Sequence, residues 1–267
     1  MAKVITFGIQ KGGPGKTTTA GITAFMLAED GYNVLAIDTD SQGNLTELLT
    51  QMDIYSFRER TVLEALKDQD ARPYIYAIRQ NLDILPSNDF MATFPRWLYL
   101  KHEGNWNAVL KETIEPVIDT YDYIIIDTPP ALSEQTLNAL VASDYVVAMY
   151  ETSKFCFSAL ERFMETVLHA QEAPDFPDQE GPNPGLVVAG ILCSLIDIRR
   201  SDAIAYLDLV QEEYGNLVFE TVIKRKAVVG RISCFGFWDN PEIEKVLEEY
   251  RVFYTELMER IKNSKEG

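Results

Sequence analysis

One stretch of the sequence decides how the fold is interpreted: Gln10-Lys11-Gly12-Gly13-Pro14-Gly15-Lys16-Thr17-Thr18-Thr19. It follows an apolar run over residues 4–9 and precedes a helix-like pattern over residues 16–30, which ends before Gly31. A glycine-rich loop between a buried strand and a helix turns successive backbone N–H groups inward and adds the positive end of the helix. The sequence therefore predicts a binding site for phosphate groups in this loop.

The end of the loop matches the P-loop pattern G-x-x-x-x-G-K-[ST]. Gly15, Lys16 and Thr17 occupy the last three positions, whereas Gln10 stands where the pattern has its first glycine. Lys16 is placed to reach the β- and γ-phosphates, and the hydroxyl of Thr17 is placed to bind Mg²⁺. The predicted nucleotide-binding residues are Lys11, Gly12, Gly13, Gly15, Lys16, Thr17 and Thr18.

Short apolar runs alternate with longer helical patterns along the chain. Strands are predicted over residues 4–9, 33–37, 82–85, 123–126, 145–149, 186–192 and 217–219. Helices are predicted over residues 16–30, 157–173, 202–214 and 241–263. This alternation is typical of an α/β fold with a mainly parallel β-sheet covered by helices on both faces.

The alternation resumes after residues 173–185, which are rich in Pro, Asp and Gly, so we interpret this segment as an exposed loop and not as a domain linker. A single P-loop NTPase domain is therefore expected over residues 1–267. Its least regular part, residues 51–115, is predicted to be a helical insertion whose core includes Trp97 and Trp106.

Composition limits the class of protein. Apolar residues make up 46% of the 267 residues, and no run approaches the roughly 18 unbroken apolar residues of a membrane span. The cysteines Cys156, Cys193 and Cys234 are far apart, which excludes a disulfide framework and a C-x-x-C metal site. We expect a cytoplasmic protein in which these cysteines are small buried side chains.

The net charge of the chain limits how it could bind nucleic acid. The chain has 24 Lys and Arg against 41 Asp and Glu, a net charge of −17. This excess of acid argues against a protein that coats nucleic acid with its whole surface, but it permits a local basic patch.

The second lysine of the loop indicates a family. Lys11-Gly12-Gly13-x-Gly15-Lys16-Thr17-Thr18 resembles the deviant Walker A motif of the ParA/MinD ATPases. The resemblance implies that Lys11 reaches across an ATP-bound dimer to the nucleotide of the partner subunit. Pro14 departs from the valine that is commoner in the family, and it removes one N–H donor from the loop.

Two acidic segments at predicted strand ends extend the resemblance. Asp38-Thr39-Asp40-Ser41-Gln42-Gly43-Asn44 is similar to the D-x-D-P-Q-G-N segment of the family, with serine in place of proline. Here Asp40 is placed to orient the attacking water, and Asp38 to support the metal shell or the P-loop. The run 122–130 is similar to the family's Walker B strand, which implies that Asp127 holds Mg²⁺ and that the two prolines after it begin a switch loop.

Other segments point to one branch of the family. Ala142-Ser143-Asp144 matches a strand entry of the family, and segments 217–225 and 257–261 look most like short plasmid-partition ParA proteins of the δ type. Because the P-loop begins at Gln10, we expect no N-terminal helix-turn-helix domain and no repression of the protein's own promoter.

This resemblance implies a cycle. ATP and Mg²⁺ would close a homodimer that binds nonspecific DNA on the nucleoid. A ParB-like or small centromere-binding protein would stimulate hydrolysis to ADP and phosphate, and this would drive plasmid or chromosome segregation.

A group of basic residues is the candidate DNA surface. The segment 221–231 contains four cations and no acid, and a local patch acts within a Debye length of roughly 8–10 Å whatever the net charge. In ParA proteins such residues line up across the dimer. The segment 223–225 is alternatively placed to pack by the adenine ring. The predicted DNA-binding residues are Arg199, Arg200, Lys224, Arg225, Lys226 and Arg231.

A MinD-like positioning ATPase, acting on a membrane or a protein array, is the alternative function. Membrane binding in MinD uses a basic amphipathic helix at the C-terminus. The polar face of the predicted helix 241–263 is rich in glutamate and would be repelled by an anionic leaflet, so we expect this helix to dock on the sheet and expect no membrane partner. The iron–sulfur relatives need interface cysteines, and ligases of the dethiobiotin synthetase type lack the early lysine, so neither is favoured.

Overall fold

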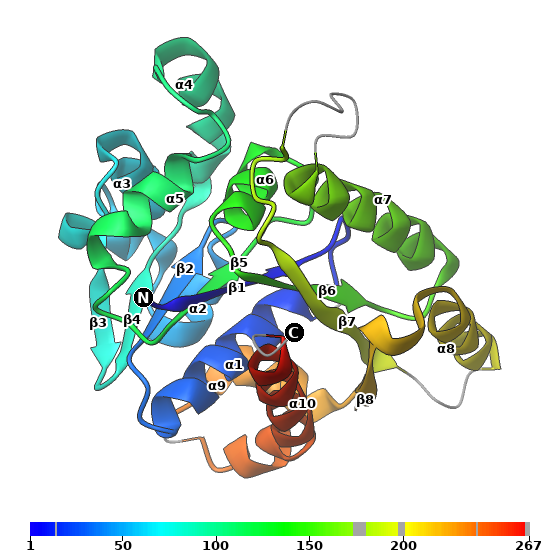
Figure 1. Cartoon of the computed structure of the whole chain (residues 1–267). Coiled ribbons are helices and arrows are strands. Elements are labelled where there is room, and N and C mark those ends of the chain that lie inside the picture. The colour runs from blue at the N-terminus through cyan, green and yellow to red at the C-terminus, as the bar shows by residue number, and fades with distance from the viewer. Residues whose placement is uncertain (14, 173–179, 197–200, 239, 265–267) are drawn as a thin grey trace.

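The computed structural model describes residues 1–13, 15–172, 180–196, 201–238 and 240–264. Within this part of the chain, the strands form one eight-stranded sheet in the order β3-β4-β2-β5-β1-β6-β7-β8, which crosses the middle of the molecule (Figure 1). Every pairing is parallel except that of β3 with β4. The predicted α/β fold is confirmed. The strands are β1 (Lys3–Gly8), β2 (Val34–Asp38), β3 (Tyr76–Arg79), β4 (Leu82–Leu85), β5 (Tyr123–Asp127), β6 (Tyr145–Tyr150), β7 (Val187–Ile196) and β8 (Val218–Lys224).

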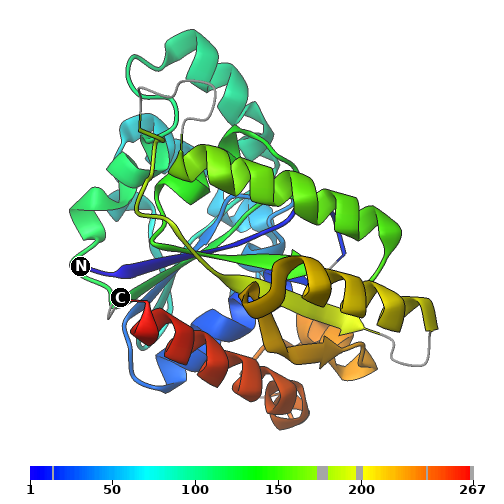
Figure 2. The same cartoon turned by 45° about the vertical axis from the view of Figure 1, so that its right-hand side comes forward.

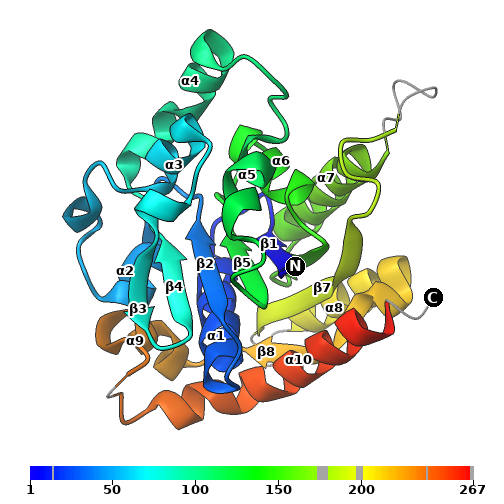
Figure 3. The ribbon, with the colours of Figure 1, turned by 60° about the vertical axis from the view of Figure 1, so that its left-hand side comes forward.

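Helices cover both faces of the sheet, as expected (Figures 2 and 3). One face carries α1 (Lys16–Glu29), α2 (Asn44–Thr50), α9 (Ala227–Phe235) and α10 (Ile243–Asn263). The other side carries α3 (Val62–Asp68), α4 (Phe94–Lys101), α5 (Val109–Ile114), α6 (Glu134–Val141), α7 (Lys154–Gln171) and α8 (Ser201–Tyr214). In the described part of the chain, no helix is both long enough and apolar enough to cross a membrane.

The central strands are apolar at nearly every position because both of their faces are buried. In β5, Tyr123 and Ile125 point into the core cluster on the side of α1, whereas Ile124 and Ile126 point into the cluster on the side of α5. All four side chains are buried. This two-sided burial explains why the sequence shows a continuous apolar run here and no alternation with polar residues.

Observed and predicted elements differ most at the sheet edges. Strand β3 has four residues of mixed polarity and forms a hairpin with β4 through Asn81, whose φ is +65°. Its short polar pattern gave no strand signal. The segment 51–115 contains α3, α4 and α5 but also contributes this hairpin to the sheet. Of the predicted loop 173–185, residues 173–179 lie outside the described part.

Two predictions of burial were wrong, those for Trp106 and Cys234. Trp97 packs against the core beside Phe94, but Trp106 is half exposed, at the edge of Tyr99. Cys156 and Cys193 are buried as expected, whereas Cys234 is exposed. Helix α9 buries Val229 and Ile232 on one face, and a residue two positions after Ile232 falls on the opposite side.

The C-terminal helix docks on the fold as predicted. It contacts β8, α1 and α9, and a stripe of side chains at helical spacing is buried in that contact. The buried residues are Val246, Leu247, Tyr250, Phe253, Tyr254, Leu257 and Ile261. Val252, on the other side of the same helix, is 61% exposed.

A pair of substitutions on α10 tests this docking. Leu257→Glu places a charge at a position with no exposed surface, and we expect it to lower the free energy of unfolding by about 3–5 kcal/mol. Val252→Glu adds the same charge at the exposed position, so we expect a change of less than about 0.5 kcal/mol. Urea unfolding followed by circular dichroism measures both. Equal effects of the two substitutions would contradict the docked helix.

Candidate nucleotide-binding site

The P-loop leaves the centre of the sheet at the end of β1 and leads into α1. Gly15, the residue before the helix, has φ +78°, in the left-handed region that glycine adopts without steric cost. No described side chain caps this end of α1 by a hydrogen bond. Its first N–H groups therefore point out of the helix toward the loop, as an anion site requires.

The lysine and threonine that follow both contact one buried carboxylate. Lys16 Nζ lies 3.1 Å from Asp127 Oδ1, and Thr17 Oγ1 donates a hydrogen bond of 2.6 Å to Asp127 Oδ2. The side chain of Lys16 is only 6% exposed, and that of Asp127 is fully buried. Burial raises the pKa of Asp127, and the adjacent Lys16 and the Thr17 hydroxyl oppose that rise. Three residues singled out from two distant motifs thus meet at one point.

Asp38 lies beside Asp127 because β2 and β5 pair in register at these two residues. Its Oδ1 accepts from the N–H of Asp40, and its Oδ2 accepts from the N–H and the hydroxyl of Thr46, at 2.9 and 2.8 Å. Burial, followed by the negative charge of Asp127, raises the pKa of Asp38 to about 7. Since both oxygens accept from the chain itself, the geometry favours a supporting role for Asp38 over direct contact with a metal.

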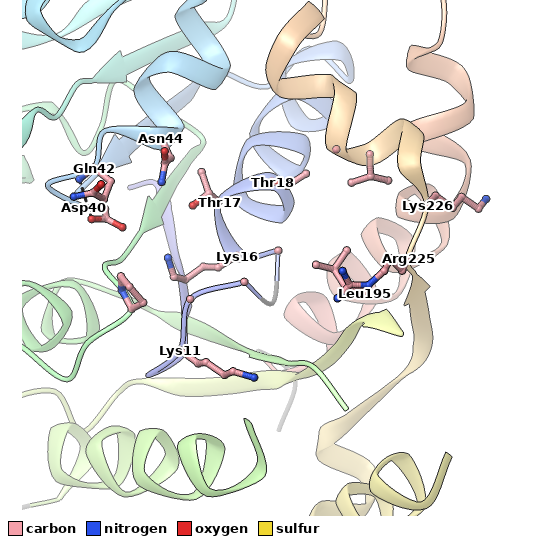
Figure 4. A pocket seen from close by; sticks show the side chains of 16 residues that line it. Lys11, Lys16, Thr17, Thr18, Asp40, Gln42, Asn44, Leu195, Arg225 and Lys226 are labelled. Carbon is pink, nitrogen blue, oxygen red and sulfur yellow. Dashed lines mark hydrogen bonds between the residues drawn. The ribbon is translucent and has the colours of Figure 1, made fainter. Parts of the chain in front are cut away.

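Asp40 lies on the pocket wall, 5% exposed, and its Oδ1 accepts from the N–H of Gln42. The turn continues through Gly43, whose φ is +62° and where a Cβ would lie 2.4 Å from Ile54 Cγ2. Only glycine fits both conditions. The turn therefore holds the carboxylate of Asp40 toward the pocket, together with Asn44 (Figure 4).

The early lysine is held apart from Lys16. In Figure 4 the side chains of Lys11 and Lys16 extend in different directions from the loop. Lys11 Nζ donates to Ser153 Oγ at 3.2 Å and lies 3.7 Å from Glu151 Oε2. Lys11 therefore does not join the cluster at Asp127 within its own subunit.

A pocket of about 440 Å³ opens beside the loop. Asp40, Gln42 and Asn44 lie on one side of the loop, and Leu195, Arg225 and Lys226 on the other (Figure 4). The lining residues are Lys11, Gly12, Gly13, Gly15, Lys16, Thr17, Thr18, Asp40, Gln42, Asn44, Pro130, Leu195, Arg225, Lys226, Val229 and Gly230. The predicted phosphate-binding residues are thus brought together.

Sequence reasoning missed part of this lining. Leu195 has φ +55°, unusual for leucine, and its side chain lies 3.5 Å from a Cβ built at Gly15. Val229 and Gly230 belong to α9, which the sequence analysis did not predict. The sequence analysis gave packing of the segment 223–225 by the adenine ring as an alternative, but it did not predict Leu195, Val229 or Gly230 beside the loop. No local sequence signal marks these three residues.

The predicted DNA-binding residues are mostly paired with acids. Arg225 contacts Glu151 at 2.7 Å, Lys226 contacts Glu249 at 2.9 Å, and Arg231 contacts Glu242 at 2.8 Å. Lys224 is exposed at the end of β8. Arg199 and Arg200 lie outside the described residues. The basic run in the sequence is therefore partly neutralised in the fold.

The donor set fits a nucleotide with Mg²⁺. Hard cations prefer oxygen ligands, which the Thr17 hydroxyl and the Asp127 carboxylate supply beside the phosphate loop. Among the described residues, Lys16 forms an ion pair with Asp127, while Asp38 and Asp40 are buried acids that form no ion pair, so this corner has an excess of negative charge that a divalent cation would balance.

The raised pKa of Asp38 predicts how stability depends on pH. Its folded pKa of about 7 exceeds the ordinary value of 3.8, so its contribution to the free energy of unfolding is fully present below pH 3.8 and is lost as the pH rises through about 7. Asp38→Asn removes this titrating group and with it this loss of stability. We therefore expect the variant to lose less stability than the wild type between pH 4 and pH 7.5.

The control is Asp208→Asn, which removes an exposed carboxylate on α8. Urea unfolding without nucleotide at several pH values measures all three proteins. Parallel curves for the wild type and Asp38→Asn would show that Asp38 is not the group responsible.

Comparison with known proteins identifies the family. A family model described as an AAA domain matches residues 2–176. The sporulation initiation inhibitor protein Soj of Bacillus subtilis is 34% identical over 240 residues, which cover 88% of this chain and 89% of that protein. The chromosome partitioning protein ParA of Myxococcus xanthus is 30% identical over 269 residues, which cover 97% of this chain and 89% of that protein.

Solved structures agree with the fold. Apo McdA of Cyanothece superposes with a TM-score of 0.79 at 24% identity, covering 98% of this chain and all of that one. Cobyrinic acid a,c-diamide synthase of Mycobacterium smegmatis, with bound ADP and magnesium, superposes with a TM-score of 0.74 at 28% identity. The match covers 87% of this chain and 91% of that one. With the P-loop and the carboxylates described above, these similarities place the chain in the ParA/MinD family, among the partition ATPases of the ParA/Soj type.

Proposed function

We propose that this protein is a Mg²⁺-dependent ATPase of DNA partition, which ATP binding closes into a homodimer. The observation that carries the proposal is the buried contact of Lys16 and Thr17 with Asp127 at the end of the P-loop. The structure of the synthase with ADP and magnesium, on a similar fold, supports the same ligands here.

Different residues of the chain have different roles in hydrolysis. Lys16 binds the β- and γ-phosphate oxygens in place of its contact with Asp127. Thr17 and Asp127 would hold Mg²⁺, which would neutralise charge on the phosphates when bound. Asp40, at the opposite pocket wall, accepts a hydrogen bond from the attacking water and aims it at the γ-phosphorus. Asp38 supports this arrangement by holding the turn through Thr46 and Asp40.

Lys11 acts in the dimer. Within its own subunit it contacts Ser153 and Glu151 at the pocket edge, and its side chain is 31% exposed. A cation at this edge is accessible to a second subunit that docks over the pocket. We assign Lys11 to the phosphates of the partner's ATP, where it stabilises charge that develops during hydrolysis.

The dimer is the DNA-binding form. Twofold pairing places two copies of the segment 221–231 on one assembly and doubles the number of phosphates met. In this scheme a ParB-like or small centromere-binding protein stimulates hydrolysis and releases the dimer from the nucleoid. The exposed Lys224 is the best placed of the described cations.

Three substitutions separate the steps of this cycle. Lys16→Ala should lose ATP binding, since its amine is the one at the loop that faces the Asp127 site. Lys11→Ala should bind ATP as a monomer but neither dimerise nor hydrolyse. Asp40→Ala should dimerise with ATP and persist as a dimer, because the water is no longer oriented. Sedimentation velocity with ATP and Mg²⁺, beside a fluorescent-nucleotide titration, measures all three. Normal dimerisation of Lys11→Ala would refute the ATP-bound dimer of this kind.

DNA binding should depend on the nucleotide state. A dimer that meets roughly 4–8 phosphates gives a slope of about −4 to −7 for log K against log salt, with little sequence preference. Fluorescence anisotropy on two unrelated duplexes over a salt series, with ATP and with ADP, measures this slope. Lys224→Glu with Arg231→Glu should abolish binding while dimerisation survives.

The control is Lys101→Glu with Lys111→Glu, an equal charge reversal at exposed positions of α4 and α5, which should leave the affinity within about twofold. Lys226 is avoided because it lines the nucleotide pocket. Equal binding with ATP and ADP would contradict the switch. No binding at about 50 mM salt, where phosphate contacts are strong, would favour positioning on a protein array over DNA binding.

A further inference from the structure

One carboxylate connects the two sides of the pocket. Glu151 directly follows β6, and it lies beside cations that are more than two hundred residues apart in the sequence. Its Oε2 is 3.7 Å from Lys11 Nζ on the phosphate loop, and its Oε1 accepts a 2.7 Å hydrogen bond from Arg225 on the opposite wall. Glu151 is therefore the shared counter-ion of both residues.

The first turn of α7 fixes the backbone of Glu151. The N–H of Glu151 donates to Cys156 Sγ at 3.3 Å. Ser153 caps the helix by accepting from the N–H of Cys156, and the same hydroxyl oxygen accepts from Lys11 Nζ. Glu151 and Ser153, two residues apart before α7, thus both contact Lys11, and Arg225 contacts the same glutamate.

We propose that Glu151 is a positioning residue that restrains Lys11 within its own subunit until the ATP-bound dimer forms. The inference rests on the proposed role of Lys11 at the partner's nucleotide. Lys11 Nζ cannot remain beside Glu151 and also reach phosphates in another subunit. Dimerisation therefore breaks this contact in both subunits, and the contact opposes association by the free energy that it contributes.

The exposure of the two side chains determines how strongly their contact opposes dimerisation. The side chains of Lys11 and Glu151 are 31% and 23% exposed, so solvent screens the pair and each contact is weak. Because the dimer loses two such contacts, Glu151→Gln should lower the dimer dissociation constant by about two- to fivefold. The glutamine keeps the shape and an acceptor for Arg225, so we expect an unchanged melting temperature.

The dimer dissociation constant is measured by sedimentation equilibrium with a saturating non-hydrolysable ATP analogue and Mg²⁺. Saturation removes any effect of the charge change on nucleotide binding to the monomer. The matched control is Glu249→Gln, which releases Lys226 on the same wall but does not contact Lys11. It should leave the constant unchanged. An unchanged or weaker dimer in Glu151→Gln would overturn the proposal.

A second measurement does not depend on dimerisation. Acetylation of Lys11 by limiting acetic anhydride, quantified by mass spectrometry in the nucleotide-free protein, reports how firmly the amine is held. Glu151→Gln should raise the rate about two- to fivefold, and Glu249→Gln should not. Equal rates in the wild type and Glu151→Gln would refute the restraint. A wild type that never dimerises would instead refute the proposed function, while this comparison still decides whether Glu151 holds Lys11.

Discussion

The ion pair between Lys16 and Asp127 is the contact on which the site depends. An unpaired carboxylate with no exposed surface would cost several kcal/mol, and Lys16 and the Thr17 hydroxyl remove much of that cost. The pair also connects the first turn of α1 to the end of β5, so the P-loop has a defined position over the sheet.

The buried acids beside Asp127 give this corner of the site an excess of negative charge. Asp38, beside Asp127 in the sheet, receives donors from Thr46 and from the turn that carries Asp40. Burial, and then the charge of the neighbouring Asp127, raise the pKa of Asp38, so it is unfavourable for both carboxylates to be ionised. In the proposed function, a divalent ion bound with the nucleotide would offset this repulsion, which would link the stability of the site to its ligand.

The cations around the pocket are likewise balanced by residues of opposite charge. In a chain with a net charge of −17, the cations near the pocket each find a carboxylate: Arg225 and Lys11 share Glu151, and Lys226 pairs with Glu249. In the proposed cycle, these acidic partners would limit which cations can contact DNA or nucleotide. A count of basic residues in the segment therefore overstates the charge that a phosphate backbone would meet.

The sequence by itself determined the α/β fold, the P-loop, the location of Asp38 and Asp127 at strand ends near this loop, and the docked helix α10. These features depend on local periodicity and on motifs within single strand–loop–helix units, which neighbouring residues encode. The tertiary structure alone decided that β3 joins the sheet, that Trp106 and Cys234 are exposed, that Leu195 faces Gly15, and that Glu151 bridges Lys11 and Arg225. Glu151 lies 140 residues from Lys11 along the chain, and contacts of that kind arise only when the order of strands in the sheet brings two loops to the same edge.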